Sequence, residues 1–182
     1  VGAGFYMPNL AFMYNVESPA DVNTVVTKSD GGREIRWRLE TRAGSIERAR
    51  RWEDTTYAWG IATWGVKTPG DLRVLASALG GRTFSSDWSH YRHWRDAVGE
   101  GGLVYLSAGY SAMGYLLNYW MGIEGVMYGI CDFPELMHQA VDQINQANLR
   151  LIHLLCESPA EVIVMGDNFS SDVQPPHFFA EW

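Results

Sequence analysis

Segments with helical and with strand character alternate along the chain from residue 68 onward, joined by short connections. The first helix is expected over 68–79, because Thr68 is a good N-cap residue and Pro69 suits the first helical position. The elements expected after it are a helix near 91–98, a strand over 103–107, a buried helix over 111–122, a long amphipathic helix from 132–135 through 157 and an apolar strand over 161–166. Such alternation is typical of βα units. It leaves an open doubly wound sheet and a (β/α)8 barrel as alternatives.

Residues 22–52, which precede this series, have the pattern of an all-β segment. Asp30-Gly31-Gly32 is a turn signal, and the strand after it alternates strictly between two faces. One face carries Ile35, Trp37, Leu39 and Thr41, and the other carries Glu34, Arg36, Arg38, Glu40 and Arg42. A third strand over 45–52 follows a turn at Gly44. The pattern predicts an antiparallel hairpin or meander with one face on a core and the other in water.

Seven arginines, half of the 14 cations of the chain, fall within 19 residues of this segment. They are Arg33, Arg36, Arg38, Arg42, Arg48, Arg50 and Arg51. Arginine holds carboxylates in bidentate pairs, so the cluster could recognise a carboxylate-bearing ligand or an acidic partner. The simpler interpretation is a solvated strand face of mixed charge, because Glu34, Glu40 and Glu47 are interspersed. The sequence favours this simpler interpretation.

The composition of the 182-residue chain fits one sizeable core and excludes several classes of function. The formal net charge of −7 argues against nucleic acid as a partner, because phosphate binding needs clustered cations. Two cysteines, Cys131 and Cys156, exclude a disulfide scaffold and fit a reducing, cytoplasmic compartment. No uncharged run of about 18 apolar residues occurs, so no membrane span is expected. The start at Val1 and the interrupted helix start at 175–182 lead us to expect a piece of a longer protein.

Polar side chains follow the predicted strand over 161–166. Ligands of α/β proteins bind at the carboxyl ends of strands, so we expect a binding site there. The residues placed at it are Asp167, Asn168, Ser170 and Asp172 from this strand end, with Tyr110, Ser111 and Tyr115 from the end of the preceding strand. The alternative is that Asp167 or Asp172 only caps a turn. The sequence leaves a functional role and a capping role equally open.

Three stretches of the second half resemble a known family: LVYLSAGYSAMGYLLNYWMG, CDFPELMHQAVDQINQANLRLIHLL and SPAEVIVMGDNFSSDVQPPHFFAEW. From about Gly102 to Trp182 the chain resembles the uroporphyrinogen decarboxylase family, which includes the cobamide-dependent methyltransferases of methyl-coenzyme M formation. The earlier stretch WGVKTPGDLRVL is similar to divergent, decarboxylase-like members. The resemblance implies an α/β fold, a partial (β/α)8 TIM barrel with an inserted antiparallel β-hairpin or meander. Residues 1–182 would form one such domain, truncated at both ends, with 22–52 as the insertion and 68–182 as successive βα units.

The resemblance also implies roles for individual residues. Tyr115 falls on a tyrosine that faces the substrate's carboxylates in the family, and Asn168 falls where the biosynthetic decarboxylase has a serine that hydrogen-bonds the substrate. With Pro8 fixing the register, Ala3 stands where those enzymes hold an aspartate near the pyrrole NH groups, which is a departure from the pattern. Together with the strand-end pattern, this assigns Asp167 and Tyr115 as catalytic residues. Substrate binding is assigned to Asn168, Tyr110, Ser111, Ser170 and Asp172, and no metal ligand is assigned within the chain.

Two activities of the parent protein follow from the resemblance. The first is decarboxylation of the acetate side chains of a carboxylated tetrapyrrole, as in porphyrin and haem biosynthesis, which needs no cofactor. The second is corrinoid-dependent, zinc-assisted methyl transfer to a thiol, with the zinc ligands outside this chain; the departures at Asn168 and Ala3 favour it. A non-catalytic, ligand-binding barrel is the third alternative. The expected partner is a small molecule, a tetrapyrrole or a corrinoid, rather than nucleic acid or a membrane, and a homodimer of the full-length protein is left open.

Overall fold

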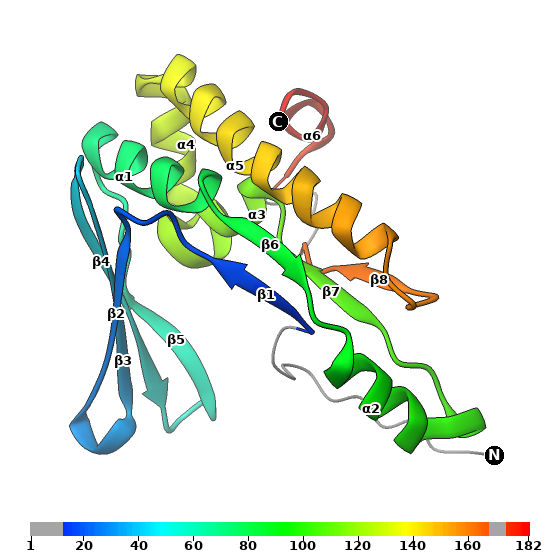
Figure 1. The fold of residues 1–182 in the computed structure, drawn as a ribbon. Coiled ribbons are helices and arrows are strands. Elements are labelled where there is room, and N and C mark those ends of the chain that lie inside the picture. Colours follow the sequence, from blue (N-terminus) through cyan, green and yellow to red (C-terminus); the bar gives the residue numbers. More distant parts are fainter. Residues whose placement is uncertain (1–12, 168–173) are drawn as a thin grey trace.

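The computed structural model describes residues 13–167 and 174–182 and arranges them as helices packed against three separate sheets (Figure 1). The strands are β1 (Tyr14–Glu17), β2 (Asn23–Ser29), β3 (Glu34–Thr41), β4 (Gly44–Glu53), β5 (Ala58–Thr63), β6 (Thr83–Ser86), β7 (Leu106–Gly109) and β8 (Ile163–Met165). The helices are α1 (Pro69–Gly80), α2 (Ser89–Val98), α3 (Ala112–Tyr115), α4 (Gly122–Asp132), α5 (Pro134–Cys156) and α6 (Pro176–Glu181). Shorter turns are the 3-10 turns η1 (Asp30–Gly32) and η2 (Gly99–Gly101) and the π-helical turn η3 (Leu116–Trp120).

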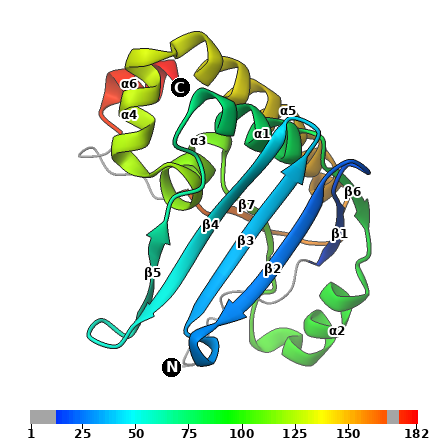
Figure 2. The same cartoon turned by 90° about the vertical axis from the view of Figure 1, so that its left-hand side faces the viewer.

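Strands β2 to β5 form a four-stranded antiparallel meander, which Figure 2 shows face on. Its register pairs Leu39 with Ile46 and Trp37 with Arg48, so the alternation expected along β3 places these side chains on one face. Leu39 and Ile46 are buried in the core, whereas every residue of β2 is exposed. The antiparallel arrangement expected within 22–52 is therefore confirmed. The sequence pattern did not predict the fourth strand, β5.

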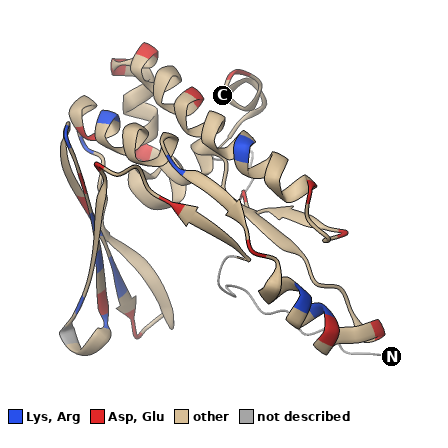
Figure 3. Cartoon of the chain, viewed as in Figure 1, with Lys and Arg blue, Asp and Glu red and all other residues tan. Residues whose placement is uncertain are grey.

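Acidic and basic residues are interspersed along the strands of the meander (Figure 3). The Glu34 carboxylate forms ion pairs with Arg36, whose Nη2 lies 2.5 Å from Oε1, and with Arg51, whose Nη2 lies 2.7 Å from Oε2. Arg36 Nη1 also lies 2.9 Å from Glu47 Oε1. The remaining ion pairs here are Arg33–Asp54, Arg38–Glu40 and Arg42–Asp21. The simpler interpretation of the arginine cluster, a strand face of mixed charge, holds for these five arginines. It does not account for Arg48 and Arg50.

Replacing Glu34 with glutamine is expected to remove a pH-dependent part of the stability. Hydrogen bonds from Arg51 and Arg36 hold the pKa of Glu34 below its ordinary value of 4.5 in the folded state. A group with a depressed folded pKa stabilises the fold above its unfolded pKa, and that contribution is lost as the pH falls through the folded pKa. The melting-temperature difference between wild type and Glu34→Gln should be present at pH 7 and shrink towards pH 3. The exposed Glu161→Gln is the control, and an undiminished difference at pH 3 would contradict the prediction.

Helix α5 connects the two buried apolar clusters of the described chain. Its first half places Ile144 in the larger cluster with Leu72 of α1, and Figure 1 shows these two helices side by side. Its second half places Leu155 in the smaller cluster with Leu106 of β7. One face of a 23-residue helix, about 35 Å long, therefore serves both clusters. Neither α5 nor another helix of the described residues is long and apolar enough to cross a membrane.

Local sequence signals predict where α1 begins, but they do not predict how the segment 111–122 is organised. Helix α1 begins as expected, because Thr68 and Asp71 form a capping box: Thr68 Oγ1 accepts from the Asp71 N–H at 3.2 Å, and Asp71 accepts from the Thr68 N–H at 2.9 Å. The helix expected over 111–122 is instead formed by α3 and the π-helical η3, and a separate helix, α4, follows it. Helix α4 begins at Gly122, whose φ of 73° favours glycine, and a Cβ there would lie 2.7 Å from the Trp64 ring.

The expected partial (β/α)8 TIM barrel is wrong. Among residues 13–167 and 174–182, only β7 and β8 pair in parallel, β6 pairs with β1 in the antiparallel sense, and no barrel closes. The continuous apolar run over 161–166 is typical of a parallel strand buried on both faces, but β8 has three residues, and Val164 and Met165 are 37% and 47% exposed. The physical reason is that helix–strand alternation fixes the order of the elements but not which strands pair. The fold is mixed α/β, and its largest sheet is the antiparallel meander.

Candidate functional site

The parallel pair β7 and β8 brings Ser111 and Asp167 together just beyond the strands. The Gly166 N–H donates to the Gly109 carbonyl at 2.8 Å, which extends the pairing past β8. The Asp167 carboxylate then accepts from the Ser111 N–H, at 3.0 Å through Oδ1 and 3.3 Å through Oδ2. Ser111 in turn caps α3, because its Oγ accepts from the Gly114 N–H at 3.0 Å. Two residues that are 56 positions apart in the sequence thus share one hydrogen-bonded turn.

Asp167 approaches the first turn of α3 closely because residue 114 is glycine. A Cβ at Gly114 would collide with Asp167 Oδ1 and would lie 3.0 Å from the Tyr110 ring. The carboxylate therefore lies at a helix start, where the backbone N–H dipoles favour negative charge. An ionised carboxylate offers about four lone-pair sites, and the single N–H of Ser111 occupies only part of that capacity. The arrangement positions a charge that can still accept from a ligand.

Three tyrosines surround this turn. The ring centroids of Tyr110, Tyr115 and Tyr119 are 5.3 to 6.0 Å apart, and all three side chains are half-buried. Burial raises the pKa of the Tyr110 phenol above its ordinary value of 10.0, followed by a hydrogen bond and a charge interaction with Tyr119 and then by the charges of Asp167 and Tyr115. At neutral pH this phenol therefore keeps its proton and can donate it in a hydrogen bond. We call Tyr110, Ser111, Tyr115, Tyr119 and Asp167 the tyrosine site.

Two guanidinium groups lie against the edges of the tyrosine site. The guanidinium carbon of Arg82 is 5.5 Å from the Tyr115 ring centroid, and that of Arg48 is 5.1 Å from the Tyr119 ring centroid. Both distances lie in the range of cation–π contacts. The site thus combines one carboxylate, three phenols and two cations, which is a donor-rich surface suited to an anionic organic molecule.

Two asparagines of α5 hold the loop that carries the site. Asn145 Oδ1 accepts from the Ala112 N–H at 3.1 Å, and Asn148 Nδ2 donates to the Tyr110 carbonyl at 3.2 Å. Asn148 is buried, so its hydrogen bond also satisfies a polar group inside the core. The sequence patterns predicted a role for neither asparagine, nor for Tyr119. A usable signal was present, because Asn148 lies on the apolar face of α5 and Tyr119 is four residues after Tyr115.

The structure places four of the seven sequence-predicted site residues in one cluster. Asp167, Ser111, Tyr110 and Tyr115 come together as described, whereas Asn168, Ser170 and Asp172, like Ala3, lie outside the described residues. Across residues 13–167 and 174–182, no group of three or more His, Cys, Asp or Glu side chains is placed to hold a metal ion.

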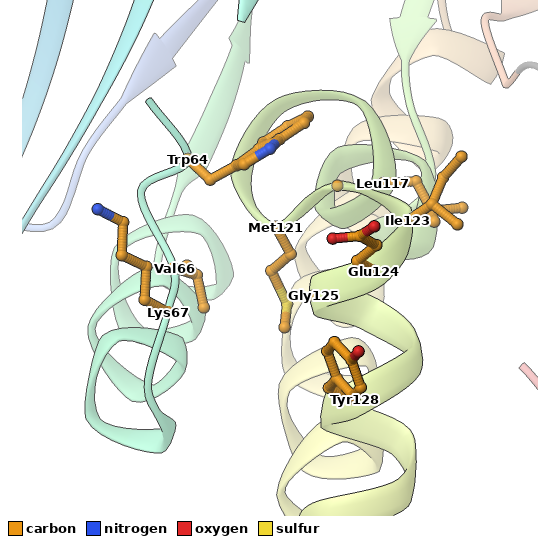
Figure 4. Close-up of a pocket in the computed structure, with 10 residues that line it drawn as sticks. Trp64, Val66, Lys67, Leu117, Met121, Ile123, Glu124, Gly125 and Tyr128 are labelled. Atoms are coloured by element: carbon orange, nitrogen blue, oxygen red, sulfur yellow. The ribbon is translucent and has the colours of Figure 1, made fainter. Parts of the chain in front are cut away.

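An apolar groove of about 470 Å³ lies elsewhere, between the connection from β5 to α1 and the start of α4 (Figure 4). Trp64 and Lys67 line it from the connection, and Met121, Glu124 and Tyr128 line it from the α4 side. None of the predicted site residues lines this groove. It offers one carboxylate and one ammonium group on apolar walls, and so it lacks the clustered proton donors of the tyrosine site.

No family model, no curated protein and no solved structure matches this chain. The resemblance to the uroporphyrinogen decarboxylase family therefore stays a prediction from the sequence. Function is inferred from the contacts of the tyrosine site, with that resemblance as the guide to the class of substrate.

Proposed function

We propose that the tyrosine site serves a cofactor-free decarboxylase that removes carboxyl groups from the acetate side chains of a carboxylated tetrapyrrole or a similar polyacid. The observation that carries the proposal is the Asp167 carboxylate, which Ser111 holds beside the phenols of Tyr110 and Tyr115. Such a reaction develops positive charge on a pyrrole ring, and it requires that the negatively charged carboxylates of the substrate be held in place. The site offers a carboxylate for the first and proton donors for the second.

The chemistry assigned to the site is acid catalysis followed by carbon–carbon bond cleavage. Protonation of a pyrrole ring carbon makes the ring a cation that can accept an electron pair. The bond between the side-chain carbon and its carboxylate then breaks, carbon dioxide leaves, and the electron pair neutralises the ring. The resulting methylene group takes up a proton and becomes a methyl group, and the ring carbon then releases the proton that it took up first, so that one proton is consumed for each carbon dioxide released. A positioned negative charge such as Asp167 stabilises the cation in the transition state more than in the ground state.

The phenols and the guanidinium of Arg82 are assigned to substrate carboxylates. Tyr110 keeps its proton at neutral pH, so it donates a hydrogen bond without competing for charge. Arg82 lies over the face of Tyr115 and adds positive potential at that edge of the site. The proposal places this reaction in the cytoplasm. Cys131 and Cys156 are both exposed, unpaired thiols, and thiols stay reduced in that compartment.

Turnover of uroporphyrinogen under anaerobic, light-protected conditions tests the proposal. We expect carboxyl groups to be lost one after another. Chromatography of the oxidised porphyrins and the amount of carbon dioxide released measure this loss. Tyr115→Phe should lower the rate about 10-fold or more, since it removes a donor that contacts the substrate's carboxylate. The matched control is Tyr128→Phe on α4, which changes an exposed tyrosine outside the tyrosine site. Equal rates for the two variants would argue against the role of Tyr115.

The corrinoid-linked alternative stays a prediction and gives a different result in the same experiment. The full-length parent protein, purified without added zinc, would then hold about one tightly bound zinc per molecule. That result, together with methylation of a thiol and no release of carbon dioxide, would replace the decarboxylase proposal. Metal content by mass spectrometry and the carbon dioxide assay are independent readouts. Failure of both reactions would leave a ligand-binding role for the tyrosine site.

A further inference from the structure

Arg48 and Arg50 differ from the other five arginines of the meander. Cross-strand pairing sets Arg48 opposite Trp37 and Arg50 opposite Ile35, on the face that also carries the buried Leu39. The other five contact carboxylates of the solvent side. Two cations therefore lie on the core-facing side of the sheet, where the alternation of the sequence predicts apolar contacts.

Three aromatic rings surround the Arg48 guanidinium. Its central carbon lies 4.1 Å from the ring centroid of Trp37 on β3, and 5.1 Å from those of both Tyr119 and Trp120 on η3. Its Nε and Nη1 atoms are buried, and neither donates to an acceptor of the described residues. Nε of Arg50 is buried in the same way, although Nη2 of Arg50 donates to the Trp59 carbonyl at 2.8 Å. The hydrogen-bonding capacity of these guanidiniums is thus only partly used within the described chain.

No carboxylate of the described residues neutralises Arg48. Burial, and then the like charge of Arg50, lower the pKa of Arg48 to about 10, and the phenols of Tyr119 and Tyr115 act in the opposite direction. Arg48 is still a cation at neutral pH, because its pKa remains well above 7. Aromatic faces offset part of the cost of burying a charge, but they accept no conventional hydrogen bond from Nε or Nη1. Arg48 is therefore a half-buried cation with two buried, unused donors, and an anion that accepts from them would stabilise it.

We propose that Arg48, with Arg50 beside it, is the anchor of a binding site for a carboxylate anion between the meander and η3. A carboxylate fits better than a phosphate dianion, because a monoanion costs less to transfer from water into these aromatic surroundings and its two oxygens match the planar fork of a guanidinium. The inference goes beyond the proposed decarboxylation and does not depend on it, since an anion can bind here whatever reaction the tyrosine site performs. Its position next to Tyr119 makes it an extension of the tyrosine site towards the meander.

Binding of acetate, benzoate and inorganic phosphate, each titrated at constant ionic strength, tests this site. Calorimetry should show saturable binding of a carboxylate, and the Arg48 Nε–H resonance should shift as it binds. Arg48→Met keeps the aliphatic stem but removes the charge, and it should weaken the affinity at least 10-fold. The matched control is Arg38→Gln, which removes an exposed guanidinium that pairs with Glu40 on the solvent side. Its affinity for the carboxylate should be unchanged.

Thermal melting separates a binding role of Arg48 from a purely structural one. A ligand that binds only the folded chain raises its melting temperature, so the carboxylate should stabilise wild type and Arg38→Gln but not Arg48→Met. If Arg48→Met fails to fold, Arg48→Lys, which keeps the charge but loses the planar fork, should weaken binding instead. Absence of saturable binding, equal affinity in Arg48→Met and wild type, or tighter binding of phosphate than of either carboxylate would overturn the proposal.

Discussion

Asp167→Asn is expected to lower the rate of decarboxylation by about 100-fold or more while leaving the fold unchanged. Asparagine keeps an oxygen that can accept from the Ser111 N–H, so the turn beyond β7 and β8 should persist. What is lost is the negative charge that would stabilise the ring cation. The measurements are kcat and kcat/KM from the release of carbon dioxide, with circular dichroism and the melting temperature as checks of the fold.

A second substitution separates the charge of Asp167 from its position. Gly114→Ala leaves the carboxylate in the chain, but its Cβ would collide with Asp167 Oδ1, so the carboxylate has to move. It should reproduce a large part of the loss seen with Asp167→Asn. Gly101→Ala is the matched control, because a Cβ at Gly101 meets no atom within 4 Å. If both Asp167→Asn and Gly114→Ala keep full activity, Asp167 has no catalytic role and only caps a turn, which is the alternative that the sequence leaves open.

Leu155→Ala is expected to cause a large loss of stability, about 2–5 kcal/mol in the free energy of unfolding. Leu155 is 0% exposed in the smaller apolar cluster, and its truncation leaves a cavity that α5 cannot close without moving. Leu149→Ala on the same helix is the control, because Leu149 is 46% exposed. That control should change the free energy of unfolding by less than about 0.5 kcal/mol. Urea denaturation followed by circular dichroism measures both.

The shape of the unfolding curve carries a further test of this prediction. Because α5 connects the two clusters, Leu155→Ala should shift the urea midpoint of a single transition. Two separate transitions, with only one of them shifted, would show that the smaller cluster unfolds alone. Equal midpoints for the Leu155 and Leu149 variants would contradict the burial of Leu155.

Local signals predicted the parts of the fold that depend on near neighbours in the sequence. The alternation from Glu34 to Thr41 follows the two faces of β3, and Thr68 with Pro69 marks the start of α1. Both depend on interactions within a few residues, so a single sequence contains them. The sequence also placed Asp167 and Ser111 at the ends of two strands, whereas the contact between them depends on the parallel pairing of β7 with β8.

Long-range pairing was beyond the reach of the same signals. The short strand β6 pairs with β1, about 70 residues away, and nothing in its four residues specifies that partner. The family resemblance predicted a partial (β/α)8 barrel, and the observed strand pairing contradicts that prediction. Tyr119 was missed because its role depends on the π-helical turn, and Asn148 because its partner is a backbone carbonyl on another element. Packing decides such contacts, and composition does not record them.

The π-helical turn η3 sets how far the residues after it, including α4, are rotated about the helix axis relative to the tyrosine site. The Met121 N–H donates to the Leu116 carbonyl at 2.8 Å, five residues back, so this turn holds about one residue more than an α-helical turn. Removing one residue would rotate everything after it by about 100° about the helix axis. Trp120 would then leave Arg48, and its carbonyl would leave the Val66 N–H, from which it now accepts at 2.9 Å. The number of residues in this turn therefore sets where Trp120 and α4 lie relative to the meander.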